Sequence, residues 1–188
     1  MIRAATLAFA GIAGLGLFEA ASAAIIPTKA VVAQMLLNRA FERSVATGER
    51  VKPWPWADMA PVARITIPRL GLSEVALDSG SGQALAFGPT FLPTAAAPGA
   101  PGTAVAAAHR DTHFRGLKDV RIDDTIVVEG IDGHSRSYQV DSLQVVRWDR
   151  FAISSDRSTA HVALVTCYPF GATTHGPMRF IVQATKIG

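Results

Sequence analysis

HVALVTCYPF, residues 161–170, is the stretch that decides the fold. Its first six residues are mostly apolar and β-branched, which is typical of a buried β-strand. Pro169 has no N–H to donate to a sheet and therefore ends the strand. The segment predicts a strand over residues 161–166 that delivers Cys167 to the rim of a sheet, where a substrate can reach the thiol.

Short segments with a similar pattern lie on both sides of this strand. The chain has 11 Pro and 16 Gly, which favours many turns and a β-rich fold over a helical bundle. A long Gly/Ala/Pro loop is expected over residues 79–102. Seven or eight short strands with almost no helix predict a closed β-barrel or a sandwich. The other expected strands cover residues 63–67, 75–77, 103–108, 125–129, 137–148 and 178–184.

Two of these strands have distinctive patterns. Residues 103–108 are apolar without alternation, which predicts a strand buried on both faces. In residues 137–148 the apolar positions shift by one, from Tyr138 and Val140 to Leu143 and Val145. A shift of this kind indicates a β-bulge.

Residues 1–27 have the composition of an export segment. Ala4 to Phe18 is uncharged and would span about 22 Å as a helix, less than the roughly 30 Å of a bilayer core. The sequence allows a signal anchor that continues past Glu19, or a signal peptide cleaved after Ala21-Ser22-Ala23. Both interpretations place the rest of the chain outside the cytoplasm.

Residues 28–60 form a second predicted region, an amphipathic helix followed by a Pro/Trp linker. The helix is expected over residues 28–45, with Thr28 as N-cap and Gly48 as its stop. Its apolar positions form one stripe, which favours packing on the main domain or a stalk. We expect Trp54 and Trp56 to cover an apolar edge of the third region, a β-barrel domain over residues 61–188.

The composition excludes several classes of protein. Hydrophobic residues make up 49% of the chain, so it can build a core and is not disordered. The net charge is only +3 and there is no basic run, which argues against nucleic-acid binding. The single cysteine, Cys167, excludes an internal disulfide and a CxxC pair. An exported chain that keeps one unpaired thiol favours a functional role for it.

Two further residues suit nucleophilic chemistry at this thiol. A cysteine thiol has an ordinary pKa near 8.5, so a nucleophile needs cationic neighbours at neutral pH. His109 could stabilise the thiolate and transfer a proton to a leaving amine. Arg179 could stabilise an oxyanion with its fixed charge. Their separations in sequence do not establish proximity, and a core Cys with a surface-directed Arg is the structural alternative.

A metal site is the other chemistry considered for this region. His109, Asp111, His113 and Cys167 are residue types that bind zinc, but the segment lacks an HExxH motif and follows a strand. We therefore expect no metal and no other cofactor. Asp111 could orient a neighbouring side chain or pair with Arg110 or Arg115. The remaining histidines, His134, His161 and His175, are interpreted as surface or hydrogen-bonded residues.

Three segments together resemble the signature segments of sortases: HRDTHF (109–114), LVTCYPF (164–170) and PMRF (177–180). The resemblance implies an eight-stranded sortase-type β-barrel with short helices. The sequence is also similar to the proteobacterial subgroup of sortases called class GN, over residues 28–44, 52–71 and 85–99. Two positions differ from the usual pattern of the family: Ala108 occupies a position where Gly is common, and Ala163 one where Thr is common.

The resemblance also implies an activity. Cys167 would attack the carbonyl of an LPxTG-like sorting signal of an exported partner protein, His109 would act as acid and base, and Arg179 would hold the oxyanion. An amine acceptor would resolve the thioester. Thr166 and Asp111 are expected to contact the substrate. The enzyme would be held at the inner membrane with its barrel in the periplasm. An exported thiol peptidase and a non-catalytic binding module are the alternatives.

Overall fold

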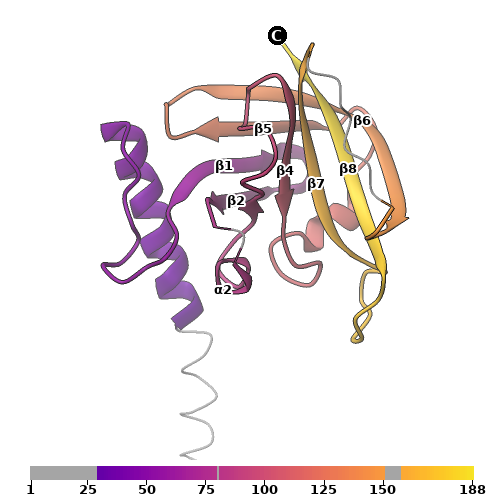
Figure 1. The fold of residues 1–188 in the computed structure, drawn as a ribbon, viewed down its shortest axis with the longest axis horizontal. Helices are drawn as coiled ribbons and strands as arrows, with labels where there is room; N and C mark the ends of the chain where they lie inside the picture. The colour runs from indigo at the N-terminus through magenta and orange to yellow at the C-terminus, as the bar shows by residue number, and fades with distance from the viewer. Residues whose placement is uncertain (1–28, 80, 151–157) are drawn as a thin grey trace, which may run out of the picture. The chain divides into compact units, whose positions relative to one another are not determined.

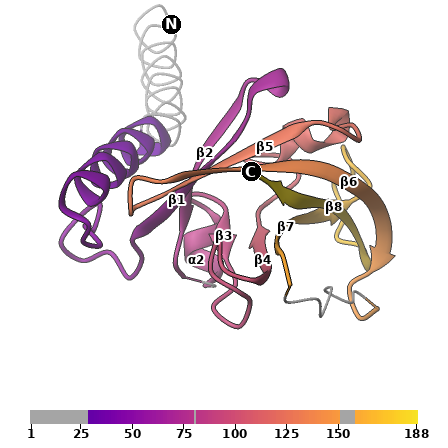
Figure 2. The same ribbon diagram turned by 90° about the horizontal axis from the view of Figure 1, so that it is seen from above.

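The computed structural model describes residues 29–79, 81–150 and 158–188. Within them eight strands close into a barrel with the order β1-β2-β3-β4-β7-β8-β6-β5 (Figures 1 and 2). The prediction of a closed barrel is confirmed. The strands are β1 (Pro61–Ile67), β2 (Leu72–Leu77), β3 (Thr90–Phe91), β4 (Gly102–Ala107), β5 (Thr125–Gly130), β6 (Ser135–Arg147), β7 (Ala160–Tyr168) and β8 (Met178–Ile187).

Three short helical segments connect these strands: η1 (Pro68–Leu70), α2 (Gly82–Leu85) and η2 (Arg115–Asp119). A longer helix covers residues 29–47. The chain divides into two compact units, Met1–Leu36 and Leu37–Gly188. The predicted export segment over residues 1–27 and the N-cap Thr28 lie outside the described residues. No described helix is both long enough and apolar enough to span a bilayer.

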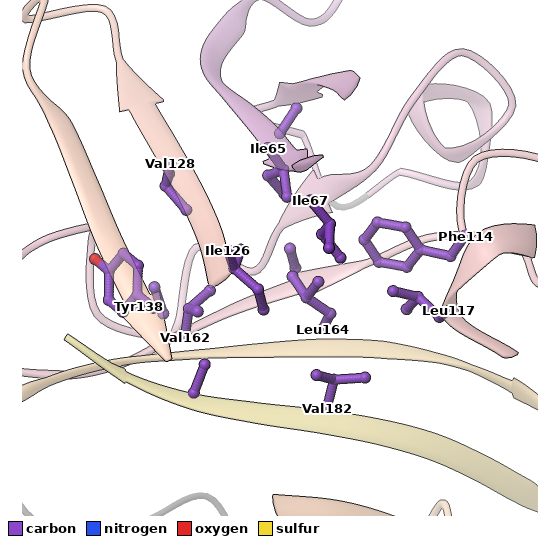
Figure 3. Close-up of a cluster of buried hydrophobic side chains, with 14 of the residues drawn as sticks. Ile65, Ile67, Phe114, Leu117, Ile126, Val128, Tyr138, Val162, Leu164 and Val182 are labelled. Carbon is purple, nitrogen blue, oxygen red and sulfur yellow. The ribbon is translucent and has the colours of Figure 1, made fainter. Parts of the chain in front are cut away.

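The barrel interior is filled by alternate residues of each strand. In β1 every second residue is buried, as the two-residue period of a strand requires. Figure 3 shows Ile65 and Ile67 of this strand beside Phe114, Leu164 and Val182. All eight strands contribute residues to this single core, which fixes the register of the strands around it.

The two distinctive strand predictions are confirmed. Strand β4 is buried on both faces over its first five residues. In β6 the pairing with β8 shifts between Val140 and Ser142, so that Asp141 is the extra residue of a bulge. The bulge explains why the apolar positions of this strand change phase.

The prediction of a continuous loop over residues 79–102 is wrong for part of this segment. It contains helix α2 and strand β3, which pairs with both β2 and β4. The Ser81 hydroxyl caps α2 by accepting a hydrogen bond from the Ala84 N–H at 3.1 Å. A four-residue helix and a two-residue strand are too short to produce a periodic pattern in the sequence.

The C-terminal part of the long helix packs as its apolar stripe predicts. Leu37 and Phe41 are fully buried in a cluster with Met59 and Leu77. Gly48 ends the helix with a φ of +71°, and its N–H donates to the Ser44 carbonyl at 2.8 Å. The predicted stop at this glycine is therefore confirmed.

The two tryptophans of the linker behave differently. Trp54 packs edge-on against Phe87 with ring centroids 5.2 Å apart, as expected for a residue covering an apolar edge. Trp56 is 82% exposed, so the same prediction is wrong for it. The Ala57 N–H bonds back to the Trp54 carbonyl at 3.0 Å, and this turn directs the second indole away from the cluster.

A buried carboxylate ties η1 to the start of β5 and gives a pH-dependent prediction. Asp124 accepts hydrogen bonds from Arg69 Nη2 at 2.6 Å and from the Arg121 N–H at 2.8 Å. The bond from Arg69 is the main reason that the pKa of Asp124 lies below its ordinary value. A group whose pKa falls on folding stabilises the fold above its unfolded-state pKa, and this contribution disappears as the pH drops through the folded-state value.

We therefore expect Asp124→Asn to lower the free energy of unfolding by about 1–3 kcal/mol at pH 7. The difference from the wild type should shrink as the pH falls below about 4. Urea unfolding at several pH values measures both effects. Asp149→Asn is the matched control, because Asp149 pairs with Arg147 on the exposed surface and should contribute little. Equal effects of the two variants would contradict the prediction.

Candidate active site

The strand order brings the three predicted catalytic residues to one end of the barrel. β4 and β7 are parallel neighbours, so both end at the same edge, and His109 follows β4 by two residues. β8 is antiparallel to β7 and begins where β7 ends. Cys167 of β7 lies directly opposite Arg179 of β8 in this pairing. Figures 1 and 2 show β4, β7 and β8 side by side.

Cys167 is on the outer face of the barrel, at the end of an apolar strip. Leu164 and Thr166 of β7 are buried on the inner face, so Cys167 shares the outer face with Ala163 and Val165. The apolar strip is formed by a separate cluster of buried and half-buried residues: Ala95, Val105, Val146, Ala163, Val165 and Ile181. The thiol is half-buried and free, which suits a nucleophile that must be both shielded and reached.

Hydrogen bonds fasten the segment that carries His109 to the strand that carries Cys167. The Ala108 N–H donates to the Val165 carbonyl at 3.2 Å, and the Thr166 hydroxyl donates to the Ala108 carbonyl at 2.8 Å. Thr166 was expected to contact the substrate. Its hydroxyl is bonded to the residue just before His109, and Thr166 also lines a pocket together with Cys167.

Two pockets meet at His109 and Cys167. The first, here called the apolar pocket, has a volume of about 210 Å³. Besides the two shared residues it is lined by Leu85, Ala107, Ala108, Val165, Thr166 and Arg179. The second, here called the loop pocket, has a volume of about 340 Å³. Its other lining residues are Arg110, Asp111, Gly171, Ala172, Thr173 and His175.

Arg179 is held in place by the backbone around it. Its Nη1 donates to the Gly176 carbonyl at 2.9 Å and to the Met178 carbonyl at 2.8 Å. Both hydrogens of this nitrogen are thereby used, and the Nε and Nη2 hydrogens are left for other acceptors. A guanidinium that is anchored on one side and open on the other can hold a substrate oxygen without further ordering.

Arg110 is buried and joins the His109 segment to the β7–β8 loop. Its Nη2 donates to the carbonyls of Ala172 and Thr174, the latter at 2.8 Å. The sequence left several roles open for Asp111, and pairing with Arg110 is not among the contacts of the described residues, because this guanidinium bonds to the loop. Asp111 is exposed and has no ion-pair partner within residues 29–79, 81–150 and 158–188.

The remaining histidines separate into different environments. His113 bonds to Glu74 through Nδ1 at 2.8 Å, and His161 bonds to Thr185 at 3.1 Å. His134 is exposed. Among the described residues no group of three His, Cys, Asp or Glu side chains could hold a metal ion. His175, interpreted from sequence as an ordinary surface residue, lines the loop pocket, and only its place between Cys167 and Arg179 could have indicated this.

The comparison with protein families agrees with this arrangement. The model of the sortase domain matches residues 65–187, about two thirds of the chain. The chain belongs to the sortase family. Sortases are cysteine transpeptidases, and this sortase has a single cysteine, Cys167. The comparison with curated proteins found no match.

Several solved sortases have the same fold. Streptococcus agalactiae sortase C1, solved in complex with MTSET, is 26% identical with a TM-score of 0.62, covering 68% of each chain. Clostridium perfringens sortase D5 is 20% identical with a TM-score of 0.67, over 84% of this chain and 99% of that one. Corynebacterium diphtheriae sortase A is 21% identical with a TM-score of 0.64, over 84% and 85%.

Proposed function

We propose that this sortase cleaves an LPxTG-like sorting signal near the C-terminus of an exported partner protein and transfers the new C-terminus to an amine. One observation carries the proposal: Cys167, His109 and Arg179 line the same pocket, at the end of an apolar strip on the outer face of the barrel. The apolar strip suits the Leu and Pro of an extended peptide, and the pocket suits the threonine carbonyl that is attacked.

The proposed reaction has two halves. Cys167 attacks the threonine carbonyl as a thiolate, and Arg179 stabilises the negative charge that develops on the carbonyl oxygen. His109 gives a proton to the departing glycine nitrogen, so the C–N bond breaks and a thioester remains. An acceptor amine then attacks the thioester, His109 takes up the amine proton, and the sulfur leaves as a thiolate. One peptide bond is exchanged for another.

We also infer where the enzyme acts. The uncharged stretch after Arg3 is suited to hold the chain at the inner membrane, with residues 28–60 as connection and residues 61–188 as the periplasmic catalytic domain. The resemblance of residues 28–44, 52–71 and 85–99 to the proteobacterial subgroup supports this assignment. Fractionation of producing cells with protease access to the periplasm tests it.

Incubation of the full chain with a labelled LPxTG-type peptide tests the proposed activity. With a small amine present, we expect a product in which the amine is joined to the threonine. Cleavage without transfer would instead identify a thiol peptidase. Neither product would favour a non-catalytic module. The same peptide with its Thr-Gly bond reversed to Gly-Thr is the control for non-specific proteolysis.

Arg179→Lys tests the role of the guanidinium. Lysine keeps the positive charge but lacks the planar fork, so its single nitrogen cannot both replace the carbonyl-bound Nη1 and present a second nitrogen in a fixed position to the substrate. We expect kcat for peptide cleavage to fall by about 10²–10³ with a smaller change in KM. The control is Arg147→Lys. Arg147 is an exposed arginine on β6, which pairs with the strand of Arg179, and this variant should retain activity. Equal activity of both variants would show that Arg179 does not stabilise the oxyanion.

A further inference from the structure

The wall of the loop pocket contains a buried positive charge that forms no ion pair with a carboxylate of the described residues. Arg110 is only 9% exposed, and it lines this pocket together with His109 and Cys167. Its Nη2 serves two loop carbonyls, but its Nη1 is buried and has no hydrogen-bond partner in the part of the chain described. A buried guanidinium in this condition is unfavourable, so an anionic group placed beside it would be stabilised.

Asp111 contributes the opposite charge to the same pocket. It is exposed, and it is not paired with a cation within the three described ranges. The loop pocket therefore offers a fixed cation and a free carboxylate next to each other in sequence and in one lining. A small group with a carboxylate and an amino group complements this pair better than a group with a single charge.

The position of the loop pocket relates it to the second half of the reaction. It shares Cys167 and His109 with the apolar pocket, whose lining suits the acyl part of the substrate. The loop pocket is therefore available to the leaving peptide. Once that peptide has gone, the incoming amine must occupy the same place, because acyl transfer to Cys167 and away from it are the reverse of each other.

We propose that the loop pocket is the acceptor site and that it takes a primary amine whose adjacent carbon carries a carboxylate, the arrangement of an amino-acid end. Arg110 pairs with the acceptor carboxylate and Asp111 accepts a hydrogen bond from the amino group. The amine nitrogen then bonds to the thioester carbon, its proton passes to His109, and the C–S bond breaks. This inference rests on the proposed function, because an acceptor is needed only if the enzyme transfers.

Binding to the Cys167→Ala chain tests the acceptor site without requiring any reaction. Glycine and glycinamide are the probes, since both carry the amine and only glycine carries the carboxylate. In an NMR titration of the full chain, we expect glycine to shift the amides of residues 109–111 and 171–175. Glycinamide should need an about tenfold higher concentration for the same shifts.

Two variants separate the contributions to this binding. Arg110→Gln should weaken glycine about tenfold, to the level of glycinamide, without weakening glycinamide. Asp111→Asn should weaken both probes, and because Asp111 is exposed this variant keeps the proposal testable if the Arg110 variant alters the loop. Arg115→Gln and Asp119→Asn, which line neither pocket, are the controls.

The inference is overturned if glycine does not bind, if glycine and glycinamide bind equally, or if both variants retain the wild-type affinity for glycine. If the proposed function itself is wrong, the experiments give a different result. In that case the wild-type chain forms no thioester with the sorting peptide, whatever the result of the titration.

Discussion

Cys167→Ala should abolish cleavage of the sorting peptide, with a loss of at least about 10⁴ in kcat. The expectation follows from the position of the thiol, which shares its pocket with an imidazole and a guanidinium at the end of an apolar strip. The side chain lies on the outer face of β7 and outside the barrel core, so the variant should fold normally. Peptide release measures activity, and thermal unfolding checks the fold.

The single cysteine allows a reversible form of the same experiment. A thiol reagent that forms a mixed disulfide modifies Cys167 alone, because the chain has no other cysteine. Activity should disappear on modification and return on reduction of the disulfide. Turnover by the alanine variant within about tenfold of the wild type would rule out Cys167 as the nucleophile.

His109→Gln has the second-largest expected effect, a reduction of kcat by about 10²–10⁴. Glutamine can hydrogen-bond but cannot exchange a proton, so both departure of the glycine amine and activation of the acceptor should suffer. His109 is exposed at the edge of both pockets, and its loss leaves the core untouched. The pH dependence of kcat/KM should also flatten in this variant, which a merely structural role would not cause.

His134→Gln is the matched control for His109→Gln. His134 is an exposed histidine in the β5–β6 turn and lines neither pocket. Its replacement should leave both the rate and the pH profile unchanged. If the two variants behaved alike, His109 would not be the acid and base of the reaction.

The sequence predicts most of the barrel because each strand carries a visible pattern. The two-residue alternation of β1 and the phase shift of β6 follow directly from the side chains that face the core. The region between β2 and β4 could not be predicted, because β3 depends on long-range pairing with β2 and β4 and the four-residue helix α2 is too short to show a periodic pattern. Trp56 likewise depends on a turn that the sequence does not specify.

The site was predicted in part. The end of β7 places Cys167 at a rim on local grounds, but His109 lies 58 residues before it and could be joined to it only through the family resemblance. The structural cause is the parallel pairing of β4 with β7, a long-range contact. Arg110 and His175 were missed as pocket residues because their positions depend on how the β7–β8 loop returns to the barrel.

The proposed mechanism requires a thioester between Cys167 and the substrate. Intact-mass measurement of the wild-type chain mixed with a sorting peptide, quenched before turnover is complete, tests it most directly. We predict a mass increase equal to the peptide up to its threonine, located by proteolysis to the fragment that contains Cys167, and its removal on addition of an amine. Cleaved peptide without this adduct, or an adduct on another residue, would rule out Cys167 as the nucleophile.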